Sequence, residues 1–191
     1  MLTIAIFLFA VAVVWTTNAL FGPLDFADTT LWLWANIFFQ LLLSGACALL
    51  FCKILPKNIY ASDKRLSKTL PFEKKLYNFL RVKKWKDRVL DTSKISGFSK
   101  KNLSETPSAE YLEKFVREAN SGWVEHVASA ILGFALVFAC PKDAWLTIGL
   151  PVAAISALLN LMPVCSLRYT IPRLLAALKM QKRKEERAAN A

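Results

Sequence analysis

Four long apolar runs, separated by polar or basic stretches, dominate the hydrophobic pattern of the chain. They cover about residues 2–21, 31–52, 123–140 and 144–167. Each run has roughly the 17 to 25 residues that an α-helix needs to cross a bilayer. The pattern predicts an all-α, polytopic membrane protein with four transmembrane helices, in a single membrane domain covering residues 1–191.

Positive charge is concentrated between the second and third runs. Residues 53–101 hold 15 Lys or Arg against four Asp or Glu, and 24 of the chain's 25 basic residues fall on one side of a four-helix topology. Basic loops of membrane proteins remain in the cytoplasm. We therefore expect both termini, the basic loop 53–122 and the basic tail 174–191 to be cytoplasmic, in a multi-pass protein of a bacterial cytoplasmic (inner) membrane.

The basic loop also contains an amphipathic segment. After Pro71, which suits a first helical turn, large apolar residues recur at helical spacing at Phe72, Leu76 and either Phe79 or Leu80. This spacing predicts an interfacial helix on the membrane surface. Next comes Trp85 between Lys84 and Lys86, a cluster that fits lipid anchoring or a phosphorylated ligand. The polar stretch 91–107 is typical of a surface loop.

Composition narrows the function classes. The chain is 55% hydrophobic yet carries a net charge of +11, so apolar and basic residues are segregated along it. Membrane topology and anionic lipid account for the basic residues, and nucleic acid is not an expected partner. The four cysteines lack metal-ligand or disulfide-framework spacing, so neither a metal site nor a bound cofactor is expected.

The only histidine, His126, lies about one turn inside the third apolar run. Glu125 precedes it directly and Glu118 lies eight residues earlier. Ionisable groups cost roughly 2.5 to 3.5 kcal/mol at the centre of a membrane helix and usually serve a function there. Asn160, eight residues before Arg168, lies about 12 Å into the fourth run. Because these helices are antiparallel neighbours, the polar groups can face each other near the inner leaflet.

This combination suits acyl transfer. The imidazole can act as a general base, oriented by Glu118 or Glu125, while the Asn160 amide and the Arg168 guanidinium stabilise an oxyanion. Glu118 reaches the imidazole only if residues 120–122 bend the helix, and Glu125 leaves the helix about 100° away from it.

Other interpretations of the same residues stay open. The polar groups can simply tie the helices together in a non-catalytic accessory or lipid-binding membrane protein that uses its basic loop. A small transporter is a weaker alternative, because its polar groups would extend through the membrane, whereas here they crowd one leaflet.

Three blocks combine charged, aromatic and apolar residues. They are V-K-K-W-K-D-R-V-L-D at 82–91, R-E-A-N-S-G-W-V-E-H at 117–126, and N-L-M-P-V-C-S-L-R-Y-T-I-P-R-L at 160–174. They resemble blocks of the glycosyl-4,4'-diaponeurosporenoate acyltransferase family, small integral membrane enzymes of the staphyloxanthin pathway. That family has R-K-W-K, a Glu eight residues before a His, and an Asn followed after seven residues by R-Y-N-R-P-R-L.

The resemblance implies the esterification of a sugar hydroxyl on a carotenoid glycoside, a step of carotenoid biosynthesis. It supports catalytic roles for Glu118, His126, Asn160 and Arg168, and substrate binding by Lys84, Trp85, Lys86, Tyr169 and Arg173. The sequence departs from the family at Trp123 and Val127, where the family has Glu and Trp, and at Thr170 and Ile171, where it has Asn and Arg. These departures leave the acceptor open.

Together these observations predict a membrane acyltransferase. It takes a fatty acyl group from acyl-CoA or acyl carrier protein, whose negative charge suits the basic cluster, and passes it to a hydroxyl or amine of a lipid-like or glycosylated acceptor at the cytoplasmic leaflet. The bilayer, the acyl donor and the acceptor are its expected partners. The acyl chain length and the oligomeric state stay open.

Overall fold

The computed structural model describes residues 2–89 and 108–190, which form an all-α protein. The long helices are α1 (Leu2–Phe21), α2 (Phe26–Leu49), α5 (Ala109–Leu132) and α6 (Leu150–Ala189). Between α2 and α5 lie α3 (Pro71–Phe79) and α4 (Val82–Trp85). Short 3-10 or π segments are η1 (Leu50–Ile54), η2 (Lys57–Tyr60), η3 (Arg65–Ser67), η4 (Lys86–Arg88), η6 (Gly133–Ala139), η7 (Lys142–Ala144) and η8 (Trp145–Gly149).

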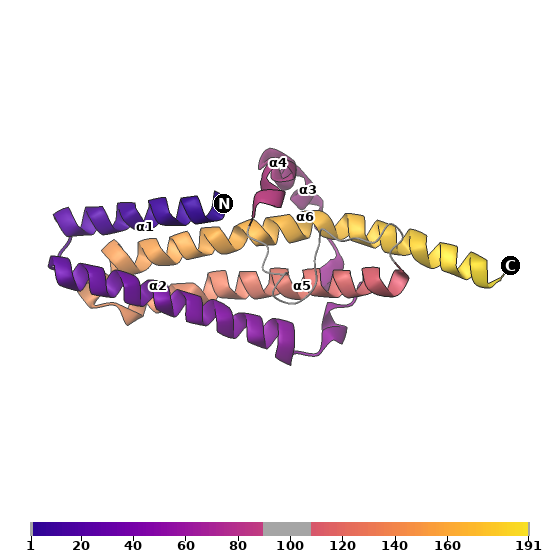
Figure 1. Ribbon diagram of the computed structural model, residues 1–191, viewed down its shortest axis with the longest axis horizontal. Helices are drawn as coiled ribbons and strands as arrows, with labels where there is room; N and C mark the ends of the chain where they lie inside the picture. Colours follow the sequence, from indigo (N-terminus) through magenta and orange to yellow (C-terminus); the bar gives the residue numbers. More distant parts are fainter. Residues whose placement is uncertain (1, 90–107, 191) are drawn as a thin grey trace.

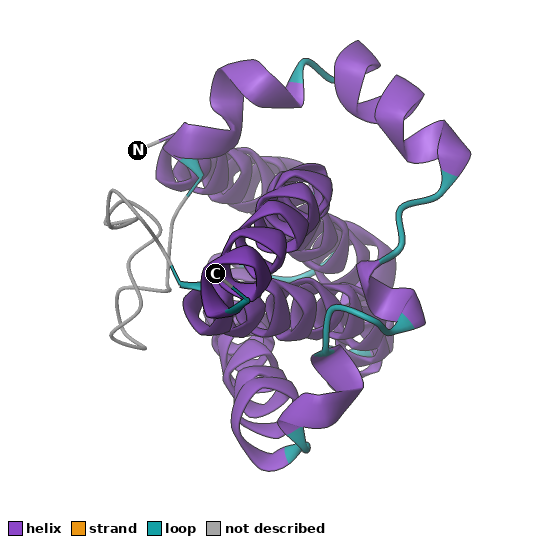
Figure 2. Cartoon of the chain, turned by 90° about the vertical axis from the view of Figure 1, so that its right-hand side faces the viewer, coloured by secondary structure: helices purple, strands orange, loops and turns teal. Residues whose placement is uncertain are grey.

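The four long helices run alternately in opposite directions in one elongated bundle (Figure 1). Four helical stretches in the described part of the chain are long and apolar enough to cross a membrane: Thr3–Phe21, Phe26–Ile54, Ala109–Ala139 and Lys142–Ala189. The predicted four-helix membrane fold is therefore confirmed. Seen along the bundle, α6 lies near its centre (Figure 2), and it contacts α1, α2 and α5.

Both α5 and α6 extend beyond α1 and α2 at the end of the bundle that carries the C-terminus (Figure 1). The apolar runs predicted at 123–140 and 144–167 are therefore only the inner parts of longer helical stretches. In particular, α6 continues through Pro163 and Pro172 as far as Ala189. Each proline removes one helical hydrogen bond, and packing against α5 keeps the helix continuous. The basic tail is helical up to that residue.

Two predicted boundaries need correction. The second span begins at Phe26 rather than Leu31, because the Asp25 carboxylate caps the helix by accepting the Asp28 backbone N–H at 2.8 Å. The bend at 120–122 that would bring Glu118 to the imidazole is absent, since α5 is unbroken there. Gly122 instead allows close packing on α6, because an added Cβ would lie 3.3 Å from a Leu167 methyl carbon. The surface loop predicted at 91–107 lies outside the described residues.

Two amides of α2 tie that helix to the segment after α5. The Asn36 side chain donates to the Leu136 carbonyl at 3.0 Å, and the Gln40 side chain donates to the Gly133 carbonyl at 2.9 Å. Both amides are buried, with 2% and 6% of their surface exposed. In hydrocarbon an unpaired polar group is costly, so these bonds fix how α2 packs in the bundle.

The amphipathic helix of the basic loop is α3, and its polar face packs inward. Glu73 and Tyr77 are buried, whereas Phe72, Leu76 and Phe79 are exposed. Burial of the polar face requires partners, and Glu73 finds them on α6. The outward apolar face is what a helix on a membrane surface needs, and its membrane contact stays a prediction.

Candidate active site

His126 lies on the face of α5 that packs against α6. Its Nδ1 atom is 3.0 Å from Oδ1 of Asn160 and 3.3 Å from a carboxylate oxygen of Glu125. The histidine side chain is 22% exposed, so it is neither sealed in the core nor open on all sides. The structure thus brings together three of the residues that the sequence singled out.

These contacts determine which nitrogen of His126 carries the proton. The Asn160 amide is oriented by its own NH₂ group, which donates to the Ser156 carbonyl at 2.9 Å, so its oxygen faces the ring. Both the amide oxygen and the Glu125 carboxylate are acceptors, and Nδ1 must therefore be the donor. In this tautomer Nε2 keeps its lone pair, which makes it available as a base.

Glu125 is the carboxylate placed to assist the imidazole. Its side chain is 9% exposed, and the Ser129 hydroxyl donates to it at 3.2 Å. Although neighbours on a helix leave the axis about 100° apart, the two side chains approach to within 3.3 Å of each other. A carboxylate beside Nδ1–H stabilises the imidazolium that forms when Nε2 accepts a proton.

Glu118 does not contact His126. Because α5 is unbroken, the two residues are about 12 Å apart along the helix axis. The Glu118 carboxylate instead forms an ion pair with the Lys57 ammonium at 2.6 Å, in which the side chains are 29% and 40% exposed. Glu118 therefore links η2 to α5, and Glu125 is the carboxylate that contacts the imidazole.

The Arg168 guanidinium is bound to other residues of the protein. Its guanidinium forms a two-point ion pair with the Glu73 carboxylate and donates to the backbone carbonyls of Leu66 at 2.7 Å and Lys68 at 2.9 Å. It also stacks over the Trp123 ring, 4.9 Å from the centroid. Lying about 12 Å along α6 from Asn160, it fixes α3 and the preceding loop to the bundle. This geometry corrects the expectation that Arg168 contacts the reacting carbonyl.

Arg168, Glu73 and the groups that bind them are called the clamp below. Its electrostatic effect appears as a shift in the pKa of Glu73. Burial alone raises a carboxyl pKa, but the hydrogen bonds from Arg168, the Leu70 backbone N–H and the Tyr77 hydroxyl outweigh it, so that the Glu73 pKa lies below its usual value. Burial and the neighbouring carboxylate raise the Tyr77 pKa, so this hydroxyl stays protonated as a donor.

The expected substrate-binding residues lie beyond the clamp. Lys84 is exposed on α4, the Trp85 indole donates to the Leu80 carbonyl at 2.9 Å, and Lys86 pairs with Asp87 at 2.8 Å. Their side chains are not part of the His126 cluster. They form a basic surface on the short helices packed against α6.

Tyr169 and Arg173 lie on α6, close to that surface. The Arg173 guanidinium donates to the Tyr169 hydroxyl at 2.9 Å and lies 4.7 Å from the centroid of its ring. The ring also meets Tyr77 edge-on, with centroids 6.3 Å apart. Arg173 is about 20 Å along the helix from Asn160, so this pair lies far from the His126 cluster, and its part in substrate binding stays a prediction.

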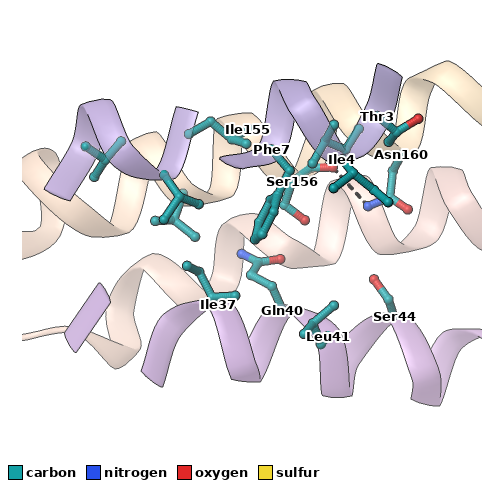
Figure 3. A pocket seen from close by; sticks show the side chains of 14 residues that line it. Thr3, Ile4, Phe7, Ile37, Gln40, Leu41, Ser44, Ile155, Ser156 and Asn160 are labelled. Atoms are coloured by element: carbon teal, nitrogen blue, oxygen red, sulfur yellow. Dashed lines mark hydrogen bonds between the residues drawn. The ribbon is translucent and has the colours of Figure 1, made fainter. Parts of the chain in front are cut away.

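A cavity adjoins the cluster. It has a volume of about 300 Å³ and lies between α1, α2 and α6 (Figure 3). Asn160 lines it, so the residue that orients His126 on one side borders the cavity on the other. Residues 2–89 and 108–190 contain no group of three or more His, Cys, Asp or Glu side chains that could bind a metal ion.

The sequence did not reveal three residues that join the basic loop to the long helices. Glu73 and Lys57 lie in the basic loop, where nothing in the local pattern indicates that each pairs with a residue on a long helix. Asn120 is fully buried, and its amide donates to the Tyr60 carbonyl at 2.9 Å and the Ser67 hydroxyl at 2.7 Å. An asparagine in the middle of an amphipathic helix was the one available signal, since such a group needs partners when buried.

One comparison with known proteins gave a match. The family model described as glycosyl-4,4'-diaponeurosporenoate acyltransferase matches residues 56–180, which include the clamp, His126 and Asn160. Neither a curated protein nor a solved structure matches the chain.

Proposed function

The chain belongs to the glycosyl-4,4'-diaponeurosporenoate acyltransferase family and is a membrane acyltransferase, and we propose that it moves a fatty acyl group from a thioester to a hydroxyl of a lipid-like or glycosylated acceptor. The observation that carries the mechanism is the hydrogen bond between His126 and Asn160, because it leaves Nε2 as the proton acceptor. An amine acceptor would use the same groups.

The proposed reaction proceeds in two steps at His126. Nε2 takes the proton from the acceptor hydroxyl as its oxygen attacks the thioester carbonyl, and Glu125 stabilises the resulting imidazolium. One N–H of the Asn160 amide is used by Ser156, and the second donates to the developing oxyanion. The tetrahedral intermediate then expels the thiolate, which receives the proton from Nε2. The products are an ester and a free thiol.

The donor is an acyl-CoA or an acyl carrier protein arriving from the cytoplasm. The surface around Lys84 and Arg173 is basic, and both donors are negatively charged. A long pantetheine arm would connect that surface with a carbonyl near Asn160, about 20 Å away along α6. This arrangement requires that both termini and the basic loop face the cytoplasm, as the distribution of Lys and Arg indicates.

A carotenoid glycoside is the acceptor that the family's name suggests, and a sugar hydroxyl is the corresponding nucleophile. At Trp123 and Thr170, however, the sequence differs from the family, which has Glu and Asn at these positions, and these differences leave the acceptor open. Trp123 packs under the Arg168 guanidinium and donates to Asn120 at 3.2 Å, so it takes part in the clamp. We therefore propose a hydroxylated, lipid-like acceptor of this general kind and treat the carotenoid itself as one candidate.

Product formation tests the proposal. The purified full-length protein is incubated in nanodiscs with radiolabelled palmitoyl-CoA or palmitoyl carrier protein and a lipid extract of membranes that contain it naturally. We expect one new lipid whose mass exceeds its precursor by one esterified acyl group. A protein that binds both components and forms no such product would be an accessory membrane protein instead.

A further inference from the structure

The cavity beside Asn160 has a polar end and an apolar end. Thr3, Ser44 and Asn160 lie at one end in Figure 3, and apolar side chains such as Ile37 and Ile155 line the part farther from them. Val14, which also lines the cavity, lies still farther along α1 from Thr3. Gln40 and Ser156 lie between these two parts, yet nearly all of the cavity surface is apolar, so a ligand that fits must be apolar along most of its length.

The cavity is elongated along the helix axes. On α1 its lining extends from Thr3 to Val14, about 16 Å at the helical rise, and on α6 it extends from Val152 to Asn160, about 12 Å. A volume of about 300 Å³ distributed over that length is narrow. This is the shape of a single extended hydrocarbon chain rather than of a sugar ring or a lipid with two chains.

We propose that this cavity holds the acyl chain of the thioester donor, an inference that rests on the proposed function. The thioester carbonyl lies at Asn160, where the amide N–H can reach it and His126 is one hydrogen bond away. The methyl end of the chain points toward Val11 and Val14. The Thr3 hydroxyl, on a residue that lines the same end, is buried and has no hydrogen-bond partner among the described residues.

The lining favours the donor chain over the acceptor. A glycosylated acceptor would bring several hydroxyls that need partners, and the Gln40 amide NH₂ is already bound to the Gly133 carbonyl. The acceptor hydroxyl would instead approach Nε2 of His126, outside the cavity. In this arrangement the cavity depth selects the length of the transferred chain, and Val14 acts as the stop.

Two adjacent valines on α1 provide a matched pair of variants. Val14 lines the cavity and is 9% exposed, whereas Val13 is 48% exposed on the outer face of the same helix. Val14→Phe shortens the cavity, and Val13→Phe adds the same bulk outside it. Since each buried methylene contributes about a fourfold change in affinity, losing room for two or three of them lowers the preference for palmitoyl over decanoyl donors by about 15- to 60-fold.

The test uses the full-length protein in nanodiscs and two measurements. The first is competition between palmitoyl-CoA and decanoyl-CoA for transfer to the lipid extract. We expect Val14→Phe to shift the product toward the decanoyl ester and Val13→Phe to match the wild type. An unchanged product ratio in Val14→Phe, or the same shift in both variants, would overturn the proposal.

The second measurement does not depend on turnover. A palmitoyl-CoA analogue with a diazirine at the methyl end is photolysed on the protein, and the labelled peptides are mapped. We expect labelling near Val11 and Val14 that palmitoyl-CoA competes away and that Val14→Phe reduces. Label confined to lipid-facing side chains, or label that palmitoyl-CoA leaves unchanged, would show that bilayer lipid occupies the cavity. Competed labelling without any product would retain the binding site and overturn the transfer reaction alone.

Discussion

Replacing Asn160 with alanine removes both the acceptor that orients His126 and the amide N–H proposed to donate to the oxyanion. The change removes the acceptor 3.0 Å from Nδ1 and leaves the ring with the Glu125 carboxylate as its remaining partner. During proton transfer the ring becomes positively charged, and a hydrogen bond to a charged group contributes about 1.5 to 3 kcal/mol, or roughly 10- to 150-fold in rate. We therefore expect kcat of Asn160→Ala to fall by at least that factor, because the proposed oxyanion donor is lost as well, while the protein remains folded.

The assay measures the rate of acyl transfer in nanodiscs. Each rate is divided by the folded fraction of the protein, which thermal unfolding measures. Asn36→Ala is the matched control, because it removes another amide that donates to a backbone carbonyl, but on α2 and with no contact to His126. We expect a lower melting temperature and a nearly unchanged kcat in the control. If Asn160→Ala keeps the wild-type kcat, or if both variants lose activity only in proportion to unfolding, the proposed orientation of the imidazole is refuted.

Three further predictions follow from the surrounding contacts. Glu125→Gln should lower kcat about tenfold or more, the contribution of a charged partner, whereas Glu118→Gln should change it less than about fivefold, because it breaks only a half-exposed ion pair. Glu73→Gln should destabilise the fold by about 3 to 5 kcal/mol in chemical unfolding, since it leaves a buried guanidinium unpaired. Because the pKa of Glu73 is lowered in the folded protein, the stability that this carboxylate provides is present above the ordinary Glu pKa of about 4.3. It is lost as the pH falls through the lower, folded pKa, and the pH dependence of the same unfolding measurement would show this loss. Reversing the charges of Lys84 and Lys86 to Glu should raise the KM for acyl-CoA and weaken its salt dependence with little effect on kcat, whereas an unchanged KM would remove this surface from donor binding.

The membrane fold could be predicted from the sequence because it depends on local composition. An apolar run such as Leu2–Phe21 indicates a transmembrane helix whatever surrounds it. Asn36 and Gln40 lie four residues apart and share a face of α2, and both donate to backbone carbonyls of η6.

The candidate site was predictable only in part, because side-chain partners distant in sequence leave little local signal. The spacing between Asn160 and Arg168 correctly placed an amide opposite His126. The same reasoning assigned Arg168 to the substrate, because its partner Glu73 lies 95 residues away in a loop dominated by lysines. The cavity was not predicted at all, since it arises from how α1 packs against α2 and α6 rather than from any motif.

The claim on which the account depends is that the His126 imidazole is the base in acyl transfer. The most direct measurement is the turnover of His126→Gln relative to wild type in nanodiscs, at saturating palmitoyl-CoA, with folding checked by thermal unfolding. Glutamine can occupy the space and bond to Asn160 but cannot take up the proton, so we expect a loss of about 10²- to 10⁴-fold. A folded His126→Gln protein that turns over at the wild-type rate would contradict the mechanism.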